Sequence, residues 1–190
     1  MRSNILKEIK NRKSPAVFKT KDVEKKKLDA VIEAARWAPS CFNNQAWNYV
    51  FVHKKDKTRK SLEKSLTPGN GWARKAPYIA AVGADPKKDC KTNGLPYYAY
   101  DAGLSVMNLS IEAEHQGLSV HQMAGFSEKK VRKAIGFSKD HRVIVVFALG
   151  YDSDPKSVWD KLSSRIKDRI VQPRQRKPVD DNFFFGKFEA

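Results

Sequence analysis

The chain has 190 residues, of which 41% are hydrophobic, and a formal net charge of +16 at neutral pH. This length fits one domain, or one domain with a tail, and the hydrophobic content is enough for a core, which excludes a disordered chain. No apolar run reaches the roughly 18 residues that a membrane-spanning helix needs, and the opening residues contain no apolar signal-peptide core.

The two cysteines, Cys41 and Cys90, are too few for a disulfide framework in a chain of this length. We therefore expect reduced thiols in a cytoplasmic protein.

The positive charge would attract polyanions over a distance of about 8–10 Å at ordinary salt. The basic residues are mixed with acidic ones in stretches such as 21–30 ("KDVEKKKLDA") and 52–60 ("VHKKDKTRK"), without interleaved aromatic residues. This pattern favours a solvated face over a specific nucleic-acid site.

The first half of the chain predicts two helices and two strands after a short N-terminal helix. Apolar spacing predicts a helix over residues 22–38, capped by Asp22 or Thr20 and ended by Pro39, with a face formed by Val23, Leu28, Val31, Ile32 and Ala35. Residues rich in β-formers predict a strand over 48–53, followed by a surface helix over 56–66 and a buried, nearly all-apolar strand over 76–85.

The second half begins with the longest predicted helix, residues 97–117, which is closed by Gly117. It is apolar on several sides, as a core helix is, and one stripe carries Tyr100, Leu104, Met107, Ile111 and His115. A strand and loop over 118–126, a helix over 127–137 capped by Ser127, and a buried strand over 141–152 follow.

The composition changes after residue 151. Residues 157–172 predict one more helix, whereas residues 173–190 hold prolines, charges and three consecutive phenylalanines and cannot form a core alone. Exposed phenylalanines would be a liability, so we expect this tail to lie on a partner subunit. The predicted organisation is one domain over 1–172 and a C-terminal arm over 173–190.

Three kinds of site have little support. The four histidines and two cysteines show no metal-ligand spacing. Cys41 and His121 could act as nucleophile and base, but Cys41 as a small residue that fills a turn is the favoured interpretation. Residues 69–74 ("GNGWAR") lack a third glycine and do not follow a strand, so they are not a nucleotide fingerprint.

Three polar clusters remain as candidate binding sites, although each alone also fits a solvated surface. The first places Arg12, Lys13 and Ser14 directly before Pro15, and the second lies in the connection that carries Ser40, Asn43 and Gln45.

The third cluster is residues 173–178 ("PRQRKP"). In an extended segment Arg174 and Arg176 would point to the same side. Two guanidinium groups on one side suit a phosphate, whose oxygens arginine binds bidentately.

Five motifs occur in a fixed order along the chain: Arg-x-Ser at 12–14, "AARWAPSCFNNQAW" at 34–47, "YDAGLSVMNLSIEAEHQGLSVHQMAGF" at 100–126, "VVFALGY" at 145–151 and "RQRKP" at 174–178. This order resembles the nitroreductase family of flavin enzymes. The resemblance extends from about residue 4 to residue 188, and Ala-Pro-Ser-x-x-Asn-x-Gln-x-Trp is its most specific part.

The resemblance implies an α+β, nitroreductase-like fold with a central, mostly antiparallel sheet flanked by helices. It also implies an intertwined homodimer with an exchanged C-terminal tail and FMN at the dimer interface. NADH or NADPH would donate electrons, and nitro compounds, quinones or related small molecules would accept them in a ping-pong reaction. The flavin then carries the chemistry, so no catalytic side chain is expected.

By position, the resemblance implies that Arg12, Lys13 and Ser14 bind the phosphate and the ring of the flavin. It implies that Arg176, with Arg174, binds the same phosphate. A backbone N–H from the segment Met123, Ala124 and Gly125 would face the ring. The other subunit would line the flavin with Ser40, Cys41 and Asn43, and Gln45 would hold that loop.

The chain departs from the family pattern at several positions. Ala16 stands in the cofactor-binding segment where a cation is often found, Cys41 stands where serine is common, and Ala46 replaces the proline of Gln-Pro-Trp. Asn70 is assigned to the flavin contacts of the middle region. The chain is short for the family, which predicts an open substrate pocket.

Two other functions stay open at this point. Ala16 and Ala46 leave room for a flavin-binding or flavin-handling module without reductase turnover. The second is a nucleic-acid-binding protein, which only the net charge of +16 suggests.

Overall fold

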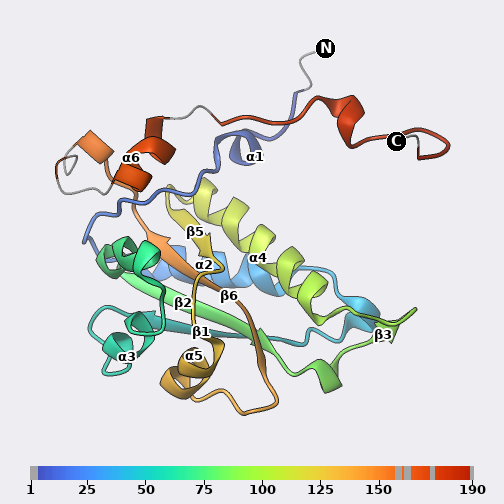
Figure 1. Cartoon of the computed structure of the whole chain (residues 1–190), viewed down its shortest axis with the longest axis horizontal. Helices are drawn as coiled ribbons and strands as arrows, with labels where there is room; N and C mark the ends of the chain where they lie inside the picture. Colours follow the sequence, from blue (N-terminus) through green and yellow to red (C-terminus); the bar gives the residue numbers. More distant parts are fainter. Residues whose placement is uncertain (1–3, 157–159, 161–163, 172–173, 189–190) are drawn as a thin grey trace. The chain divides into compact units, whose positions relative to one another are not determined.

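The computed structural model describes residues 4–156, 160, 164–171 and 174–188. The chain divides into two compact units, Met1–Asp154 and Pro155–Ala190. The first unit holds a four-stranded sheet with helices on both faces (Figure 1). This confirms the predicted α+β class with a mostly antiparallel sheet.

The sheet has the strand order β1-β2-β6-β5, and every neighbouring pair is antiparallel. The strands match the predicted ones to within a few residues and are β1 (Trp47–His53), β2 (Tyr78–Ala84), β5 (Ser119–Met123) and β6 (Arg142–Gly150). The two most apolar strands, β2 and β6, take the central positions because both of their faces are covered.

Alternate side chains of β2 enter two separate cores. Ala80 and Val82 pack with helices α2 and α4 on one face, and Ile79 and Ala81 pack with α3 and α5 on the other. The helices are α2 (Lys25–Arg36), α3 (Arg59–Glu63), α4 (Tyr98–His115) and α5 (Glu128–Ile135). Figure 1 shows the two pairs on opposite sides of the sheet.

Helix α4 buries Val106 and Leu109 together with several small residues, and it leaves two large hydrophobic residues exposed. Its buried positions include Ala102, Ser105 and Ala113, whose size lets the helix approach α2 and the sheet closely. On the predicted stripe, Tyr100 is 61% exposed and Met107 is 38% exposed. The helix is a core helix as predicted, but in a single chain part of that apolar stripe is not in the core.

The helix predicted over residues 56–66 is shorter and more buried than expected. It forms α3 over five residues, with Lys60 and Ser61 exposed as expected of a surface helix, but it buries Arg59 together with Leu62. The Arg59 side chain donates hydrogen bonds to the backbone oxygens of Val52, Ala73, Arg74, Ala76 and Pro77, and it pairs with Glu63 at 2.8 Å. The guanidinium therefore ties strand β1 to the end of η2 and to the segment that leads into β2.

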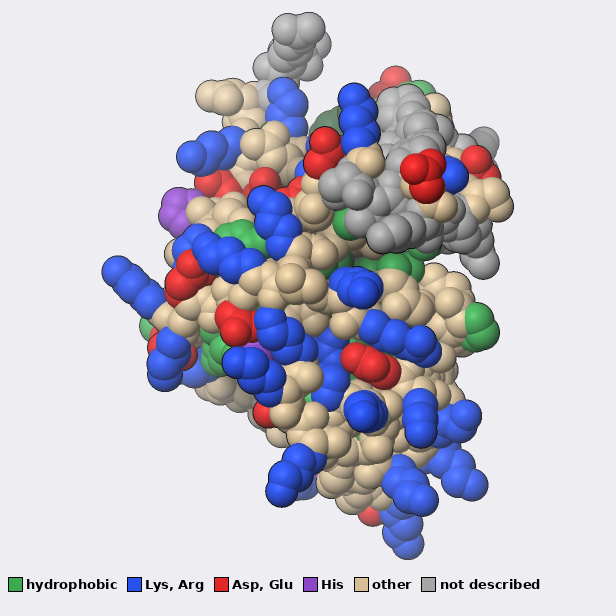
Figure 2. All heavy atoms as spheres, turned by 90° about the vertical axis from the view of Figure 1, so that its left-hand side faces the viewer, with side chains coloured by type: hydrophobic (Ala, Val, Ile, Leu, Met, Phe, Trp, Pro, Cys, Tyr) green, Lys and Arg blue, Asp and Glu red, His purple; other side chains and the backbone are tan. Residues whose placement is uncertain are grey.

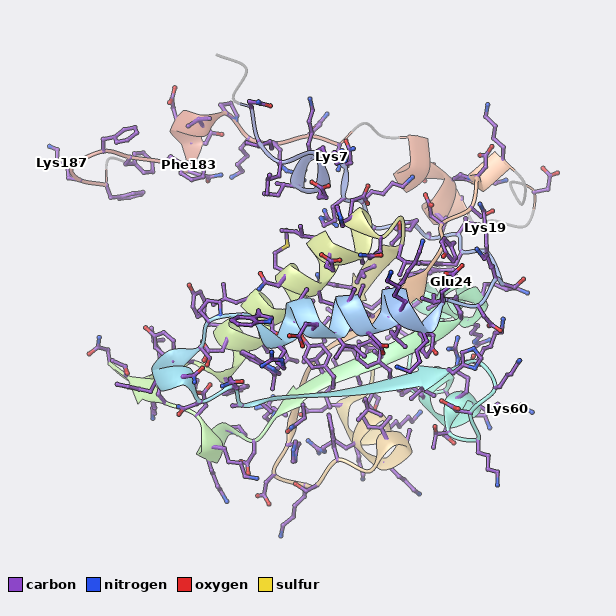
Figure 3. The ribbon with its side chains drawn as sticks, turned by 180° about the vertical axis from the view of Figure 1, so that it is seen from behind. Lys7, Lys19, Glu24, Lys60, Phe183 and Lys187 are labelled. Atoms are coloured by element: carbon purple, nitrogen blue, oxygen red, sulfur yellow. A yellow bond between two sulfur atoms is a disulfide. The ribbon has the colours of Figure 1, made fainter. Side chains whose placement is uncertain are left out.

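Neither predicted residue caps α2, whose N-cap is Glu24. Asp22 instead accepts hydrogen bonds from Lys54 at 2.6 Å and interacts with His53 at 3.0 Å, which ties the start of α2 to the end of β1. Glu24 accepts a hydrogen bond from Tyr151 and pairs with Lys21. Figure 3 shows Glu24 at the first turn of the helix.

These contacts predict acid sensitivity. Lys54, followed by His53, lowers the pKa of Asp22 from 3.8 to about 2, and Tyr151, followed by Lys21, lowers the pKa of Glu24 from 4.5 to about 2. Because both folded-state pKa values are depressed, their stabilisation is complete above the unfolded-state values and is lost as the pH falls toward about 2. We expect the free energy of unfolding to fall over this acid range.

The measurement is urea unfolding at a series of acid pH values. The double variant Asp22→Asn/Glu24→Gln should show a shallower dependence, and added salt should weaken the dependence in the wild type because both pairs are exposed. The same pH dependence of the free energy of unfolding in variant and wild type would contradict the assignment of the acid sensitivity to Asp22 and Glu24.

The remaining elements of the first unit are short. They are α1 (Lys7–Asn11), β3 (Lys91–Thr92), β4 (Leu95–Pro96) and the 3-10 turns η1 (Cys41–Asn43), η2 (Pro68–Lys75) and η3 (Pro86–Lys88). Ser127 occupies the N-cap position of α5, as predicted, but its side chain makes no capping hydrogen bond. The carboxylate of Glu128 in the first turn accepts a hydrogen bond from the N–H of Val143 in β6.

Gly83 lies at the register shift between β2 and β6 and has no space for a side chain. An added Cβ would lie 2.6 Å from the Phe137 ring and 2.8 Å from the carbonyl oxygen of Arg142. We expect Gly83→Ala to lower the free energy of unfolding by about 1–3 kcal/mol, because the neighbouring strand cannot retreat without losing ladder bonds. Gly71→Ala, where a Cβ meets nothing within 4 Å, is the control for denaturant unfolding.

The second unit holds α6 (Ser164–Val171) and the turn η5 (Val179–Asp181). Part of the helix predicted over 157–172 lies outside the described residues. Beyond η5, Phe183, Phe185 and Phe188 are exposed, and Figure 3 shows Phe183 and Lys187 on the loop that follows this turn. The predicted arm of residues 173–190 stays a prediction.

Basic side chains dominate the face shown in Figure 2, with fewer acidic ones between them. Exposed cations on and around α3 include Lys55, Lys57, Lys60 and Lys64. No described helix is long and apolar enough to cross a membrane.

Candidate functional site

The N-terminal polar cluster is anchored against the sheet. The carbonyl oxygen of Pro15 accepts a hydrogen bond from His121 Nδ1 of β5 at 2.8 Å, and Phe18 is buried and bridges to Asp152. Arg12 Nη1 donates to Ser14 Oγ at 3.4 Å. Lys13 pairs with Asp152 at 2.6 Å, so a bound anion would share this lysine with a carboxylate.

An aromatic stack joins this cluster to the turn η2. Trp72 lies between Phe18, whose ring centroid is 6.1 Å away, and His121, at 4.2 Å. Sequence reasoning missed Trp72, because "GNGWAR" was tested only as a nucleotide fingerprint. No local pattern in the sequence points to Trp72, because its two ring partners lie in separate segments of the chain.

The same turn holds the segment after β5. The carbonyl oxygen of Gly125 accepts hydrogen bonds from Thr67 N at 3.0 Å, Thr67 Oγ1 at 3.1 Å and Asn70 Nδ2 at 2.9 Å. An added Cβ on Gly125 would lie 2.5 Å from Thr67 Oγ1 and 2.8 Å from Asn70 Nδ2. Two residues assigned to the cofactor, Asn70 and Gly125, therefore meet, and only glycine fits between its neighbours.

The peptide group between Ala124 and Gly125 has a defined orientation. Its carbonyl oxygen accepts a hydrogen bond from Phe126 N at 3.1 Å. Because a trans peptide is planar, the N–H of Gly125 points the opposite way. No hydrogen bond between described residues has this N–H as its donor.

The connection after α2 has an unusual backbone. Phe42, Asn43 and Gln45 have φ values of 49°, 57° and 48°, in the left-handed region that residues other than glycine seldom adopt. Ser40 Oγ accepts from Gln45 N at 3.0 Å, and Gln45 Nε2 donates to Asn43 Oδ1 at 3.0 Å. Gln45 thus hydrogen-bonds to both Ser40 and Asn43 within its own loop.

The two cysteines form a disulfide, which corrects the prediction of reduced thiols. Cys41 and Cys90 have Cα atoms 6.2 Å apart across a separation of 49 residues. The sequence rule for disulfide frameworks failed because one bond between two surface segments needs no framework. The alternative in which Cys41 and His121 form a catalytic pair is also wrong, because Cys41 is bonded to Cys90 and His121 lies against Pro15.

A buried carboxyl group, that of Asp101 in α4, contacts the same loop. Asp101 is 1% exposed and accepts a hydrogen bond from the N–H of Cys41 at 2.8 Å. Burial raises the pKa of Asp101, the hydrogen bond from Cys41 opposes that rise, and the nearby Asp89 adds to it.

The predicted site residues of the first unit fall into two groups. Arg12–Ala16, Asn70 and Met123–Gly125 gather beside β5, whereas Ser40–Gln45 lie at the first turn of α4. Figure 1 shows η1 beside β3 and away from β5. Within the second unit, Arg174 and Arg176 are exposed, and Arg176 Nη1 donates to Gln175 O at 2.7 Å.

The described residues contain no group of three or more side chains that could hold a metal ion. The chemistry available at these groups is therefore that of cations, amides, an oriented N–H and aromatic rings.

Comparisons with known proteins agree with this arrangement. A protein of Mycolicibacterium smegmatis, described as an uncharacterized 15.4 kDa protein, is 33% identical over 133 residues, which cover 70% of this chain and 86% of that protein. A protein of Archaeoglobus fulgidus with the provisional name NADH dehydrogenase/NAD(P)H nitroreductase is 25% identical over 171 residues, which cover 87% and 95%.

A solved structure described as an oxidoreductase containing FMN has the same fold, with a TM-score of 0.87 and 24% identity over 100% of this chain and 96% of that one. The family model of the Nitroreductase family matches residues 9–151, well over half of the sequence. The chain belongs to the nitroreductase family.

Proposed function

We propose that this protein is an FMN-dependent oxidoreductase that takes electrons from NADH or NADPH and passes them to nitro compounds, quinones or related small acceptors. Family membership supports the reaction class, and the similar oxidoreductase containing FMN supports the cofactor. When bound, FMN supplies the hydride chemistry, and the protein binds and orients it.

The observation that carries the proposal is the oriented N–H of Gly125 beside the N-terminal cations. Gly125 is fixed by Thr67 and Asn70, and the same strand, β5, holds Pro15 through His121. A flavin needs donors for its ring heteroatoms and cations for its phosphate, and the segments that carry these groups are both held to β5 or to the residues directly after it, which supports the proposal. We assign the ring to Gly125 and Asn70, and the phosphate to Arg12, Lys13 and Ser14, with Arg174 and Arg176 from the C-terminal arm.

We assign the second group to a neighbouring copy of the chain. The loop Ser40–Gln45 is held at the first turn of α4, away from β5 (Figure 1). A site that contains both groups would therefore form between two copies of the chain, which supports a homodimer. Exposed apolar side chains support this assembly. They include Trp37 at 72%, Phe42 at 87% and Tyr100 at 61% exposure, all near the start of α4 or the end of α2.

The first test is spectroscopic. Purified protein should be yellow and dimeric in analytical ultracentrifugation, and NAD(P)H should bleach its flavin absorbance in a stopped-flow instrument before an added quinone restores it. A protein that stays colourless after incubation with FMN would overturn the proposal.

The alternative function is flavin binding or handling without general turnover. Ala16 and Ala46, where the family pattern has other residues, are the observations that favour it. Steady-state NAD(P)H oxidation with a nitroarene or quinone distinguishes the two, because a flavin-handling protein would hold FMN without sustained oxidation.

A further inference from the structure

The disulfide Cys41–Cys90 joins two surface segments that have few other contacts with one another. The first segment is the turn η1, and the second runs from Asp89 into the β3–β4 hairpin, whose residues 91–96 are all exposed. Besides the disulfide, one hydrogen bond joins the two segments in the described part of the chain: Asn44 Nδ2 donates to Asp89 Oδ1 at 3.2 Å. Opening the disulfide would therefore leave little to hold one segment to the other.

The backbone in and beside the turn η1 also has φ values that residues other than glycine seldom adopt. Phe42, Asn43 and Gln45 all have positive φ, and none of them is glycine. Such conformations persist when the surroundings over-determine them. A covalent bond at Cys41 and a hydrogen bond from its N–H to Asp101 are two of these constraints, so we expect the turn to relax when the bond at Cys41 is removed.

The bond is reachable from solvent. Neither cysteine is fully buried, and the residues beside them, Phe42 and Lys91, are exposed. A thiol reductant can therefore approach a sulfur atom without unfolding the sheet, whose central strands are buried. Disulfides persist in oxidising compartments, and in reducing compartments they usually form transiently and act in catalysis or redox sensing.

The acidic residues near the two cysteines favour the disulfide over the reduced pair in thiol–disulfide exchange. Asp101 and Asp89 lie beside the cysteines, since they accept hydrogen bonds from the N–H groups of Cys41 and Cys90. Nearby carboxylates disfavour a thiolate, so the reduced pair gains no stabilisation from its surroundings. The second thiol of a dithiol can displace the protein from the mixed disulfide and form a cyclic disulfide. A dithiol should therefore open the bond more completely than a monothiol at equal concentration.

We propose that Cys41–Cys90 is a thiol–disulfide switch that sets the order of the loop Ser40–Gln45, and with it the retention of the cofactor. The reductant is a dithiol. Its thiolate attacks one sulfur of the protein disulfide, the Cys41–Cys90 bond breaks, and the second thiol of the reductant resolves the mixed disulfide. Two electrons pass from the dithiol to the protein, which ends with two thiols, and the dithiol ends as a disulfide. The link to the cofactor rests on the proposed function, because the contact between this loop and FMN is part of that proposal.

The test treats the native, flavin-loaded protein with dithiothreitol and follows two readouts. Alkylation and intact mass should show two new thiols under native conditions. Hydrogen exchange should become about tenfold faster or more in residues 40–45 and 90–96 while β2 and β6 stay protected, as expected for local opening. Cys41→Ser and Cys90→Ser should each show fast exchange without reductant, and the double variant should not respond to dithiothreitol.

The flavin readout separates this inference from the proposed function. We expect FMN to dissociate about tenfold faster from the reduced protein, as for a loop that must order to bind. Thiols that stay closed until the protein unfolds, or unchanged exchange after reduction, would overturn the switch and make the bond a permanent brace. Equal FMN dissociation in both states would overturn its link to the cofactor. If no FMN binds in either state, the proposed function and that link fail, while the exchange data still decide the switch itself.

Discussion

Replacing Arg59 with methionine is expected to lower the free energy of unfolding by about 3–5 kcal/mol, the cost of breaking a buried, hydrogen-bonded charge pair. The Arg59 side chain is 3% exposed, and its guanidinium donates to five backbone oxygens at 2.8–3.4 Å as well as to Glu63. Methionine fills a similar volume but offers no donor, so each of these oxygens and the Glu63 carboxylate would lose its hydrogen bond from Arg59.

Urea unfolding at several protein concentrations measures this loss without confusing it with dissociation. Arg36→Met is the matched control, because Arg36 pairs with Glu33 at 2.6 Å on an exposed helix surface, where such pairs contribute about 0–1 kcal/mol. Arg59→Lys should fall between the two, since an ammonium keeps the charge but cannot reach several oxygens as the guanidinium fork does. A loss for Arg59→Met no larger than for Arg36→Met would refute this role.

The second large effect is expected on FMN binding. If Arg12 and Arg176 both bind the flavin phosphate, each alanine variant should lose about 1.5–3 kcal/mol of binding free energy, as for hydrogen bonds to charged groups. That loss raises the dissociation constant of FMN by about 10-fold to more than 100-fold. Titration of flavin-free protein with FMN, followed by fluorescence quenching, measures the constant directly.

The double variant Arg12→Ala/Arg176→Ala tests whether the two arginines share a ligand. Residues that bind one phosphate should show a coupling energy in a double-mutant cycle, whereas independent sites should be additive. Lys25→Ala is the control, because Lys25 is an exposed residue of α2 that pairs with Asp29. Equal FMN affinity in Lys25→Ala, Arg12→Ala and Arg176→Ala would remove the phosphate assignment.

Much of the fold was predictable because local patterns carried it. The apolar runs of β2 and β6 are long enough to be buried on both faces, and these strands occupy the centre of the sheet. The regular spacing in α2 and α4 located both helices, with ends that differ by a few residues. Where local signals were weak, as in residues 56–66, the predicted surface helix was too long, and nothing in the pattern indicated that Arg59 is buried.

Less of the candidate site was predictable, because contacts between distant residues decide it. Asn70 and Gly125 are 55 residues apart, and no local pattern shows that the amide of one meets the carbonyl of the other. The role of Trp72 between Phe18 and His121 depends likewise on three separate segments. The family motifs identified most of the candidate residues, but not which of them touch within one chain.

The sequence by itself determined the class of fold, the order of its main elements and the family, because apolar periodicity and short motifs are local properties. Only the tertiary structure decided that Cys41 meets Cys90, that Arg59 is buried and that the loop Ser40–Gln45 lies apart from β5. The physical reason is that these facts depend on how the chain returns on itself. Side chains far apart in sequence become neighbours only after α4 and the central strands have packed.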